Sequence, residues 1–406
     1  MSPSPRTCTS RGQLLSLLSE ACELEHGLLC SYLYSAFSLK QELSEGGFTW
    51  QQQQRMRLWA AQIYAVASEE MLHLAQVWNL LAAIGGTPYY YRPAYPVSAR
   101  YYRLHLPLQL QPFGSAALKR FIMYELPAHV PPEDMAAQLG IPADQAPTSA
   151  DLTVGELYAL ARSGFQEIPE EQLFIGSPDR QVGEDIVDFP DIVKVVDRGS
   201  ADAAIAMIME QGEGTTAQHD DCHFGMFRKV LADFEAETAR SRDAGESFAP
   251  VRNVAENPVP RNRGGRSVPG TTLIEHPYAR EVAEYFDDVY ELMLRMLQFV
   301  FSSCTECGPV LRLFARTAIV VMPTVIKPLG EALTLLPLRE TGDLRAGPAF
   351  GMSRHVGLPV DPEVASVVVR ERLQELALEG SRLAEHPAAP VQLINAVTNL
   401  GRYAKA

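Results

Sequence analysis

The chain has 406 residues, of which 47% are hydrophobic and 21% are charged. This composition is typical of a globular protein with a sizeable core and excludes a largely disordered chain. Acidic residues outnumber basic ones by 49 to 35, giving a formal net charge of -14. Because a nucleic-acid-binding surface needs the opposite balance of charge, we expect no nucleic acid among the partners.

Two features argue against a membrane protein. The first residues, MSPSPRTCTSRGQ, contain no apolar stretch of the signal-peptide kind. The most apolar later window, 318–336, is interrupted by two prolines and two charged residues. We therefore predict no membrane span and no membrane partner, and we expect a soluble, cytoplasmic protein.

The first part of the chain predicts two long helices. Apolar residues recur at three- and four-residue steps over 11–42, which is the period of a helix with one buried face. After a Gly-Gly pair, Thr49 and Gln52 have the spacing of a capping box that opens a second helix, which continues to about Ile84. Helices of this length are typical of a helical bundle.

Residues 87–199 interrupt this pattern. They are rich in prolines and aromatic residues, with an alternating run at 102–110 that predicts short strands and an amphipathic helix over 152–166. We assign them to an irregular α/β insertion that covers the bundle as a lid. The bundle resumes with a third predicted helix over 201–210 and a fourth over about 220–238.

The last part of the chain extends the bundle. Residues 241–275 are rich in Pro, Arg, Asn and Gly and predict a surface loop, and 276–406 return to a helical pattern with a last helix over 361–384. The predicted fold is therefore mainly α. It has a four-helix bundle formed by 10–86 and 200–240, the irregular insertion, and additional C-terminal helices packed on the bundle.

Six cysteines are scattered along the chain, which is unlike a secreted disulfide framework. Cys304 and Cys307 form a single CxxC motif, without the second pair or the nearby histidines that a zinc site needs. We favour buried structural thiols for this pair and keep a redox role as the alternative.

Acidic residues on apolar helix faces are the main candidates for chemistry. Glu25 lies four residues after Ala21 and three before Leu28, so it shares the apolar stripe of the first helix. A carboxylate buried there is costly unless it is paired or bound to a metal. We expect the neighbouring His26 to lie at the surface.

The second helix repeats this feature with Glu70 and His73. Both lie among apolar residues such as Val66 and Val77. Their Glu-x-x-His spacing directs two ligands inward from one helical turn. Bundle proteins with two iron or two manganese ions combine this motif with a glutamate from a neighbouring helix.

A two-metal site needs a matching set from the second half of the bundle. The third predicted helix ends in Glu210, and the fourth begins close to His223. Asp220 stands three residues before His223 and gives an Asp-x-x-His variant of the motif, while His219 stands four residues before it and could replace Asp220 as a ligand. Each half of the bundle would then supply a single acidic residue from one helix and an acid-x-x-His motif from the next.

The pattern predicts a centre for two metal ions. Two cations about 4 Å apart repel each other, so bridging carboxylates must offset their charge. Mixed oxygen and nitrogen ligation suits iron or manganese better than zinc. We expect Glu25, Glu70 and Glu210 to bridge or chelate the metals and to take part in catalysis. The full predicted ligand set is Glu25, Glu70, His73, Glu210, His223 and Asp220.

Four segments also carry a family resemblance: LEHGLLCSYLYS, SEEMLHLAQVWNLLAAIGGTP, IMEQGEGT and HFGMFRKVL. They resemble the ferritin-like domain family typified by iminophenyl-pyruvate dimer synthases, which occurs in the indole-pyruvate coupling enzymes of violacein- and rebeccamycin-type pathways and as stand-alone proteins. The resemblance covers about residues 10–235 and implies a ferritin-like four-helix bundle. It places these residues at the family's metal-ligand positions: Glu25, Glu70, His73, Glu210 and His223. Asp220 departs from the pattern, in which a glutamate would be the ferritin-like choice.

Together these features predict a non-haem di-metal oxidase or oxygenase. It would hold two iron ions, or manganese in their place, and act with dioxygen on a small organic substrate in natural-product biosynthesis. The resemblance implies a second option, oxidative coupling of imine-type amino-acid products, which needs an upstream oxidase as partner. A non-catalytic metal-binding or scaffold protein and a mononuclear hydrolytic site are further alternatives, and a homo-oligomer is compatible with each. The structural alternative is a buried ion-pair network with Arg55, Arg57 or Lys229.

Overall fold

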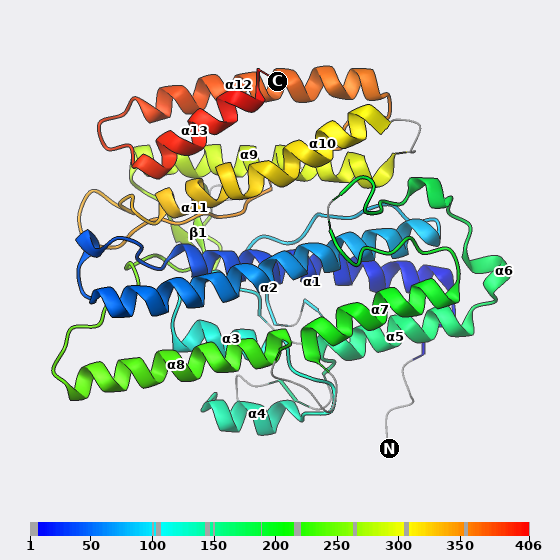
Figure 1. Cartoon of the computed structure of the whole chain (residues 1–406), viewed down its shortest axis with the longest axis horizontal. Helices are drawn as coiled ribbons and strands as arrows, with labels where there is room; N and C mark the ends of the chain where they lie inside the picture. The colour runs from blue at the N-terminus through cyan, green and yellow to red at the C-terminus, as the bar shows by residue number, and fades with distance from the viewer. Residues whose placement is uncertain are drawn as a thin grey trace.

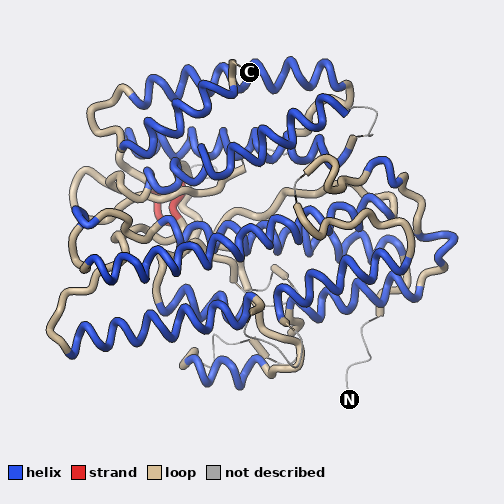
Figure 2. The backbone as a smooth tube through the Cα atoms, in the orientation of Figure 1, coloured by secondary structure: helices blue, strands red, loops and turns tan. Residues whose placement is uncertain are grey.

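Helices dominate the structure. Long helices stack in layers and run roughly parallel or antiparallel to one another (Figure 1, Figure 2). The prediction of a mainly α fold is confirmed. The computed structural model describes residues 7–99, 101–102, 107–142, 147–148, 151–187, 189–214, 221–262, 266–303, 308–352 and 356–405.

Two long antiparallel helices form the centre of the molecule. They are α1 (Arg11–Phe37) and α2 (Trp50–Ala83), joined through the short 3-10 helix η1 (Leu43–Glu45). The predicted capping box of α2 is present, with Thr49 and Gln52 bonded reciprocally. Helix α1 ends earlier than predicted because Leu39 leaves the helix and forms a β-bridge with Val251.

Two interrupted helices complete the four-helix bundle. The first consists of α3 (Ser115–Tyr124) and α5 (Val154–Glu167), which pack against α1; the second consists of α7 (Arg198–Glu213) and α8 (His223–Asp243), which pack against α2. Helix α3 packs on α8 and α5 packs on α7, so the two interruptions lie at the same level of the bundle (Figure 1).

The segment 87–199 therefore differs from the predicted lid. Its helices α3 and α5 supply one of the four bundle positions. Each half is only 10 or 14 residues long, so neither shows the length that marks a bundle helix in a sequence. In the described part of the run 102–110, Leu108 forms one β-bridge with Val97 in place of the expected strands. The segment also contains α4 (Pro132–Leu139), α6 (Glu170–Leu173) and η2 (Pro178–Arg180).

The C-terminal part forms two further layers on the opposite side of α1 and α2 (Figure 1). Helices α9 to α11 lie next to α1 and α2, and α12 and α13 form the outer layer. Cys304 and Cys307, between α9 and α10, lie outside the described residues. The elements are β1 (Pro258–Val259) and β2 (Thr272–Leu273), which pair in parallel, α9 (Pro277–Ser302), α10 (Gly308–Val321), a π-helix (Met322–Ile326), α11 (Lys327–Leu333), α12 (Pro362–Ala384) and α13 (Val391–Tyr403).

One helix contradicts the prediction that no window is apolar enough to span a membrane. Helix α10, the π-helix and α11 form one helical stretch, Gly308–Leu333, which is long and apolar enough by length and composition, with a mean hydropathy of 1.6. Its most apolar window is 39% buried, and it packs on α9 and α13. Core helices of globular proteins meet the same criterion.

Candidate metal centre

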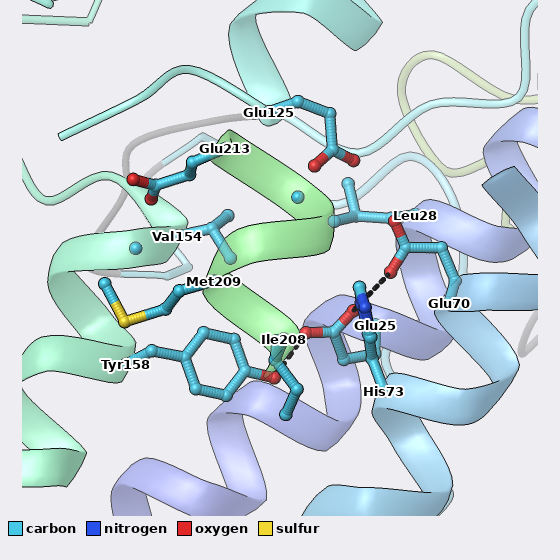
Figure 3. A pocket seen from close by; sticks show the side chains of 12 residues that line it. Glu25, Leu28, Glu70, His73, Glu125, Val154, Tyr158, Ile208, Met209 and Glu213 are labelled. Carbon is cyan, nitrogen blue, oxygen red and sulfur yellow. Dashed lines mark hydrogen bonds and ion pairs between the residues drawn. The ribbon is translucent and has the colours of Figure 1, made fainter. Parts of the chain in front are cut away.

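Four predicted ligands meet in the middle of the bundle, where its two interrupted helices break. Glu25 comes from α1, Glu70 and His73 come from α2, and His223 is the first residue of α8. Each of the four is at most 2% exposed. One ligand atom from each of Glu70, His73 and His223 lies within 4.8 Å of the other two. The structure thus brings these four residues, predicted from separate parts of the sequence, to one place in the bundle; Figure 3 shows the three that come from α1 and α2.

Glu70 stands between the two histidines. Its Oε2 lies 3.2 Å from Nδ1 of His73, and its Oε1 lies 3.1 Å from Nδ1 of His223. The centroids of the two imidazole rings are 5.4 Å apart. On the far side, Oε2 of Glu25 lies 3.7 Å from Nδ1 of His73. Glu70 therefore has the position of a carboxylate that bridges two ions.

A third carboxylate, Glu125, was not predicted. It follows the last residue of α3, is 5% exposed, and its Oε2 lies 3.5 Å from Nδ1 of His223. It stands four residues after Phe121 and seven after Leu118, both of which are buried, so it lies on an apolar stripe as Glu25 does. The same test would have identified it if 115–124 had been recognised as a bundle helix.

Glu210 does not join the cluster, contrary to the prediction. It is exposed on α7, whereas Ile208 and Gly212 are buried on the inward face of that helix. Two residues correspond to about 200° around a helix, which turns Glu210 away from the bundle axis. The acid expected from the third helix comes instead from the end of α3. Asp220 and its alternative His219 lie outside the described residues.

Each ligand is also held from its outer side. The Tyr158 hydroxyl donates to Glu25, and the Tyr32 hydroxyl donates to Glu125. On the histidines, Nε2 of His73 lies 2.9 Å from the side-chain amide oxygen Oε1 of Gln211, and Nε2 of His223 lies 2.7 Å from Oε2 of Glu69. Such outer partners fix the orientation of ligating groups and leave their inner atoms facing one another.

The net charge of the cluster depends on the protonation of Glu70 and His73, and bound metal ions would replace these protons. Burial, together with the neighbouring Glu25, raises the pKa of Glu70 to about 8. Burial also opposes the charged form of Glu25, but its hydrogen bonds with Glu70 and His73 outweigh this and lower its pKa to about 2. The same carboxylates overcome the effect of burial on His73 and raise its pKa to about 10. Protons on Glu70 and His73 thus offset the negative charge in the absence of metal.

The basic residues expected in a buried ion-pair network do not contact this cluster. Arg55 pairs with Asp233 at 2.7 Å, and Lys229 lies 3.9 Å from Asp221. Arg57 is exposed. Within the described ranges, the ion pairs of the clustered carboxylates involve histidines and no lysine or arginine. Ion pairs with lysine or arginine therefore do not stabilise these buried carboxylates.

The donor set fits two metal ions. Nδ1 of His223 is buried without a hydrogen bond although two carboxylates face it, which is the environment of a nitrogen that ligates a metal. Glu25, Glu70 and His73 would hold one ion. Glu70, Glu125 and His223 would hold the other. Oxygen ligands with one imidazole for each ion suit iron or manganese.

A small pocket lies beside the cluster, between α5 and α7 (Figure 3). Its volume of about 20 Å³ has room for about one water molecule. Apolar side chains form its wall opposite the carboxylates: Val154, Ile208 and Met209. The pocket therefore has room for a molecule of the size of water or dioxygen.

Glu213 lies at the edge of this pocket, at the end of α7. Its Oε2 accepts a hydrogen bond from the Ala128 N–H at 3.1 Å. Burial raises the pKa of this carboxyl to about 7. The carboxylate lies directly over Gly155, where any Cβ would overlap it, so a larger residue at this position would force the carboxylate to move.

The fold and the cluster define a class of protein, namely a four-helix bundle with buried carboxylate and histidine side chains gathered in its centre. The ferritin-like family model matches residues 18–232, which is more than half of the chain and includes every ligand of the described cluster. The chain belongs to the ferritin-like family. The ferritin-like architecture predicted from the sequence is therefore confirmed.

Two curated relatives are similar over most of the chain. Dichlorochromopyrrolate synthase from Lentzea aerocolonigenes is 28% identical over 403 residues, which cover 91% of this chain and 39% of that protein. The 2-imino-3-(indol-3-yl)propanoate dimerase from Chromobacterium violaceum is 28% identical over 376 residues, covering 86% and 34%. The resemblance to this group of enzymes is confirmed, and the chain spans less than half the length of either relative.

A crystal structure of a ferritin-like protein from Caulobacter vibrioides is also similar. It covers 73% of this chain and 89% of its own chain, with a TM-score of 0.46 and 18% sequence identity.

Proposed function

We propose that this chain is a non-haem di-metal oxidase or oxygenase, with iron as the expected metal and manganese as the alternative. Its reactants would be dioxygen and a small organic substrate in natural-product biosynthesis. The observation that carries the proposal is the position of Glu70 between His73 and His223, with one further buried carboxylate beside each histidine. The biosynthetic role is supported by the relatives, which are named as a synthase and a dimerase.

The metal pair, when bound, would supply the redox chemistry that reduces dioxygen. The chain's own residues prepare the site for it. Tyr158 and Tyr32 donate hydrogen bonds that hold Glu25 and Glu125 in place. Glu25 and Glu70 are at most 2% exposed, and removal from water strengthens their electrostatic interactions.

Glu213 has the properties of a proton carrier for this pocket. A carboxyl group with a pKa of about 7 exchanges its proton readily at neutral pH, which is the condition for general acid-base catalysis. Because Oε2 accepts the Ala128 N–H, Oε1 is the oxygen that can hold the proton, at the edge of the pocket beside the cluster.

The organic substrate would approach from the side of α5 and α7. Val154 and Met209 line the pocket there and are only half-buried. Because the pocket has the size of one water molecule, the substrate has to displace these side chains or react at the edge of the pocket. We propose that the segment 87–199, which supplies α5, shapes this approach.

Oxygen consumption tests the proposal. The purified protein is loaded with Fe²⁺ under anaerobic conditions and then exposed to oxygenated buffer, alone and with candidate substrates. We expect rapid oxygen uptake that Glu70→Ala and His73→Ala abolish without unfolding the protein. Glu210→Ala is the matched control, because Glu210 is exposed, and it should retain full uptake. Uptake that survives in the Glu70→Ala protein would overturn the proposal.

Oxidative coupling of imine-type amino-acid products is the second candidate. The observation that favours it is the similarity to a 2-imino-3-(indol-3-yl)propanoate dimerase. An amino-acid oxidase would act as the upstream partner and supply the imine from tryptophan in the same reaction. A coupled dimer detected by mass spectrometry would favour this candidate, and an oxygenated monomer would favour the first. Metal binding without any reaction with dioxygen would leave a non-catalytic scaffold.

A further inference from the structure

A second, much larger cavity lies on the other side of α1 and α2. It has a volume of about 450 Å³ and lies between these two helices and α9 to α11. It is separate from the metal centre, because α1 and α2 turn different residues toward each. On α1, His26 lines the cavity while Glu25 faces the metal centre, and on α2, Met71 and Leu74 line it while Glu70 faces the centre.

The cavity is elongated along the helix axes. Its lining on α2 extends from Tyr64 to Trp78, and its lining on α1 extends from His26 to Phe37. At a rise of 1.5 Å per residue, these stretches are about 20 Å and about 16 Å long. An elongated molecule fits this space better than a compact one.

Apolar side chains form nearly all of the lining. They include Leu29, Leu33, Trp78, Met293, Leu297 and Phe301. A space of this size with such a lining favours a ligand with an apolar body, because binding removes apolar surface from water on both sides.

The end of the cavity at His26 is uncharged. His26 is fully buried there, which corrects the prediction that it lies at the surface. Its Nδ1 lies 2.7 Å from the Tyr90 carbonyl oxygen, and its Nε2 lies 2.5 Å from the Tyr290 hydroxyl. Both nitrogens are thus engaged, so this end offers no cation to a ligand.

The open end carries a positive charge. Ser68 and Pro323 are exposed there. Among the described residues of the lining, Lys327 supplies the charge, and its side chain is 42% exposed. Its ammonium lies 4.6 Å from the centroid of the Tyr64 ring and 3.9 Å from Oε1 of Glu331. An ammonium group has three donors, so one carboxylate at 3.9 Å leaves it able to bind another.

The backbone at this end is unusual. The π-helix that contains Met322, Pro323 and Ile326 forms part of the cavity wall, directly before Lys327. Single π-helical turns inside α-helices occur frequently at functional sites. Here the turn brings the apolar wall and the lysine together at the opening.

We propose that this cavity binds an elongated amphipathic carboxylate, with its apolar body along α1 and α2 and its carboxylate at the Lys327 ammonium. This site is distinct from the metal centre, and its occupancy does not depend on metal.

Fluorescence titration tests the proposal on the full chain. The probe is cis-parinarate, a long-chain carboxylate whose fluorescence rises in apolar surroundings, and its methyl ester is the uncharged counterpart. We expect saturable binding of the carboxylate, with weaker binding of the ester. Competition by palmitate would identify a fatty acid as the occupant, and competition by indole-3-butyrate would identify an aromatic carboxylate. The absence of saturable binding, or equal displacement by hexadecylamine, would overturn the proposal.

Substitutions locate the binding site. Lys327→Gln should weaken carboxylate binding about fivefold, the effect of one half-exposed ion pair, and leave ester binding unchanged. Glu331→Gln removes the competing carboxylate and should tighten carboxylate binding. Lys229→Gln is the control, since Lys229 lies on α8, away from the cavity. An equal response to the two lysine substitutions would contradict the assignment of the carboxylate to Lys327.

A second variant tests the apolar part of the site. Ala75 lines the cavity and is 4% exposed, so Ala75→Phe places a ring inside it. This change should weaken binding of both the carboxylate and the ester while thermal unfolding stays close to that of the unchanged protein. Undiminished binding of both probes in a folded Ala75→Phe protein would show that they bind elsewhere, and would overturn the proposal.

Discussion

Glu125→Gln tests most directly whether the metal ligands are those that the structure brings together or those predicted from the sequence. It keeps the size of the side chain and removes one of the three described ligands available to the second ion, beside Glu70 and His223. Loss of an outer partner of a ligand already costs about tenfold to 100-fold in metal affinity. Loss of the ligand itself should therefore cost at least about 100-fold, or about 3 kcal/mol, for that ion.

The first ion should remain bound, because Glu25 and His73 are unchanged. Anaerobic titration with Fe²⁺, followed by calorimetry or equilibrium dialysis, resolves the two binding steps. We expect the Glu125→Gln protein to bind one ion with unchanged affinity and to lose the second at the same metal concentration. Glu210→Gln is the matched control and should bind both ions normally. Two tight ions in Glu125→Gln, or loss of one ion in Glu210→Gln, would refute the ligand assignment.

Four further predictions follow from the same site. Gly155→Ala places a Cβ on the Glu213 carboxylate and should lower the thermal midpoint of unfolding by several degrees, whereas an unchanged midpoint would show that the carboxylate moves freely. Tyr158→Phe removes the donor to Glu25 and should weaken metal binding about tenfold to 100-fold without loss of fold, as titration with Fe²⁺ would measure. Glu213 has a folded-state pKa of about 7 against an ordinary value of about 4.5, so the folded state binds more protons between these values and this group's contribution to the free energy of unfolding should fall as pH rises through that window, by on the order of 3 kcal/mol in the metal-free protein. Chemical denaturation at pH 5 and pH 7.5 checks this: Glu213→Gln should reduce the difference by that amount and leave the part contributed by Glu70, whose pKa of about 8 acts in the same direction. Removal of metal by a chelator should lower the free energy of unfolding by about 2.7 kcal/mol for each ion lost, relative to metal at one hundred times its dissociation constant, and an unchanged thermal midpoint would contradict specific binding to the folded state.

The sequence predicted the parts of the bundle that lie on long, uninterrupted helices. Helix α2 is 34 residues long and begins with a capping box, so its period and its start are both visible in the sequence. The interrupted helices were harder to recognise. Their halves are short, and the bundle position shared by α3 and α5 is assembled from segments 29 residues apart, between Glu125 and Val154. Only tertiary packing aligns such pieces.

The same difference between long and short helices explains which candidate ligands could be identified from the sequence. Glu25, Glu70 and His73 were identified because each lies on an apolar stripe of a long helix, where a polar residue stands out. Glu125 follows a ten-residue helix in a segment rich in proline. So short a helix does not show a clear apolar stripe in the sequence. Glu210 shares a helical face with Ala203, Ala206 and Met207, which in the sequence suggests an inward face. In the structure Ala203 and Glu210 are exposed, and the inward face of α7 carries Ile208 and Gly212 instead.

The metal content of the purified protein tests the central claim most directly. Elemental analysis is combined with optical spectra recorded under anaerobic conditions and after exposure to oxygen. The cluster of Glu25, Glu70, His73, Glu125 and His223 predicts about two iron or manganese ions per chain and, with iron, a new near-ultraviolet band when oxygen is admitted. Far less than one metal ion per chain, unchanged after reconstitution with Fe²⁺ or Mn²⁺, would contradict the claim and leave these buried carboxylates with a purely structural role.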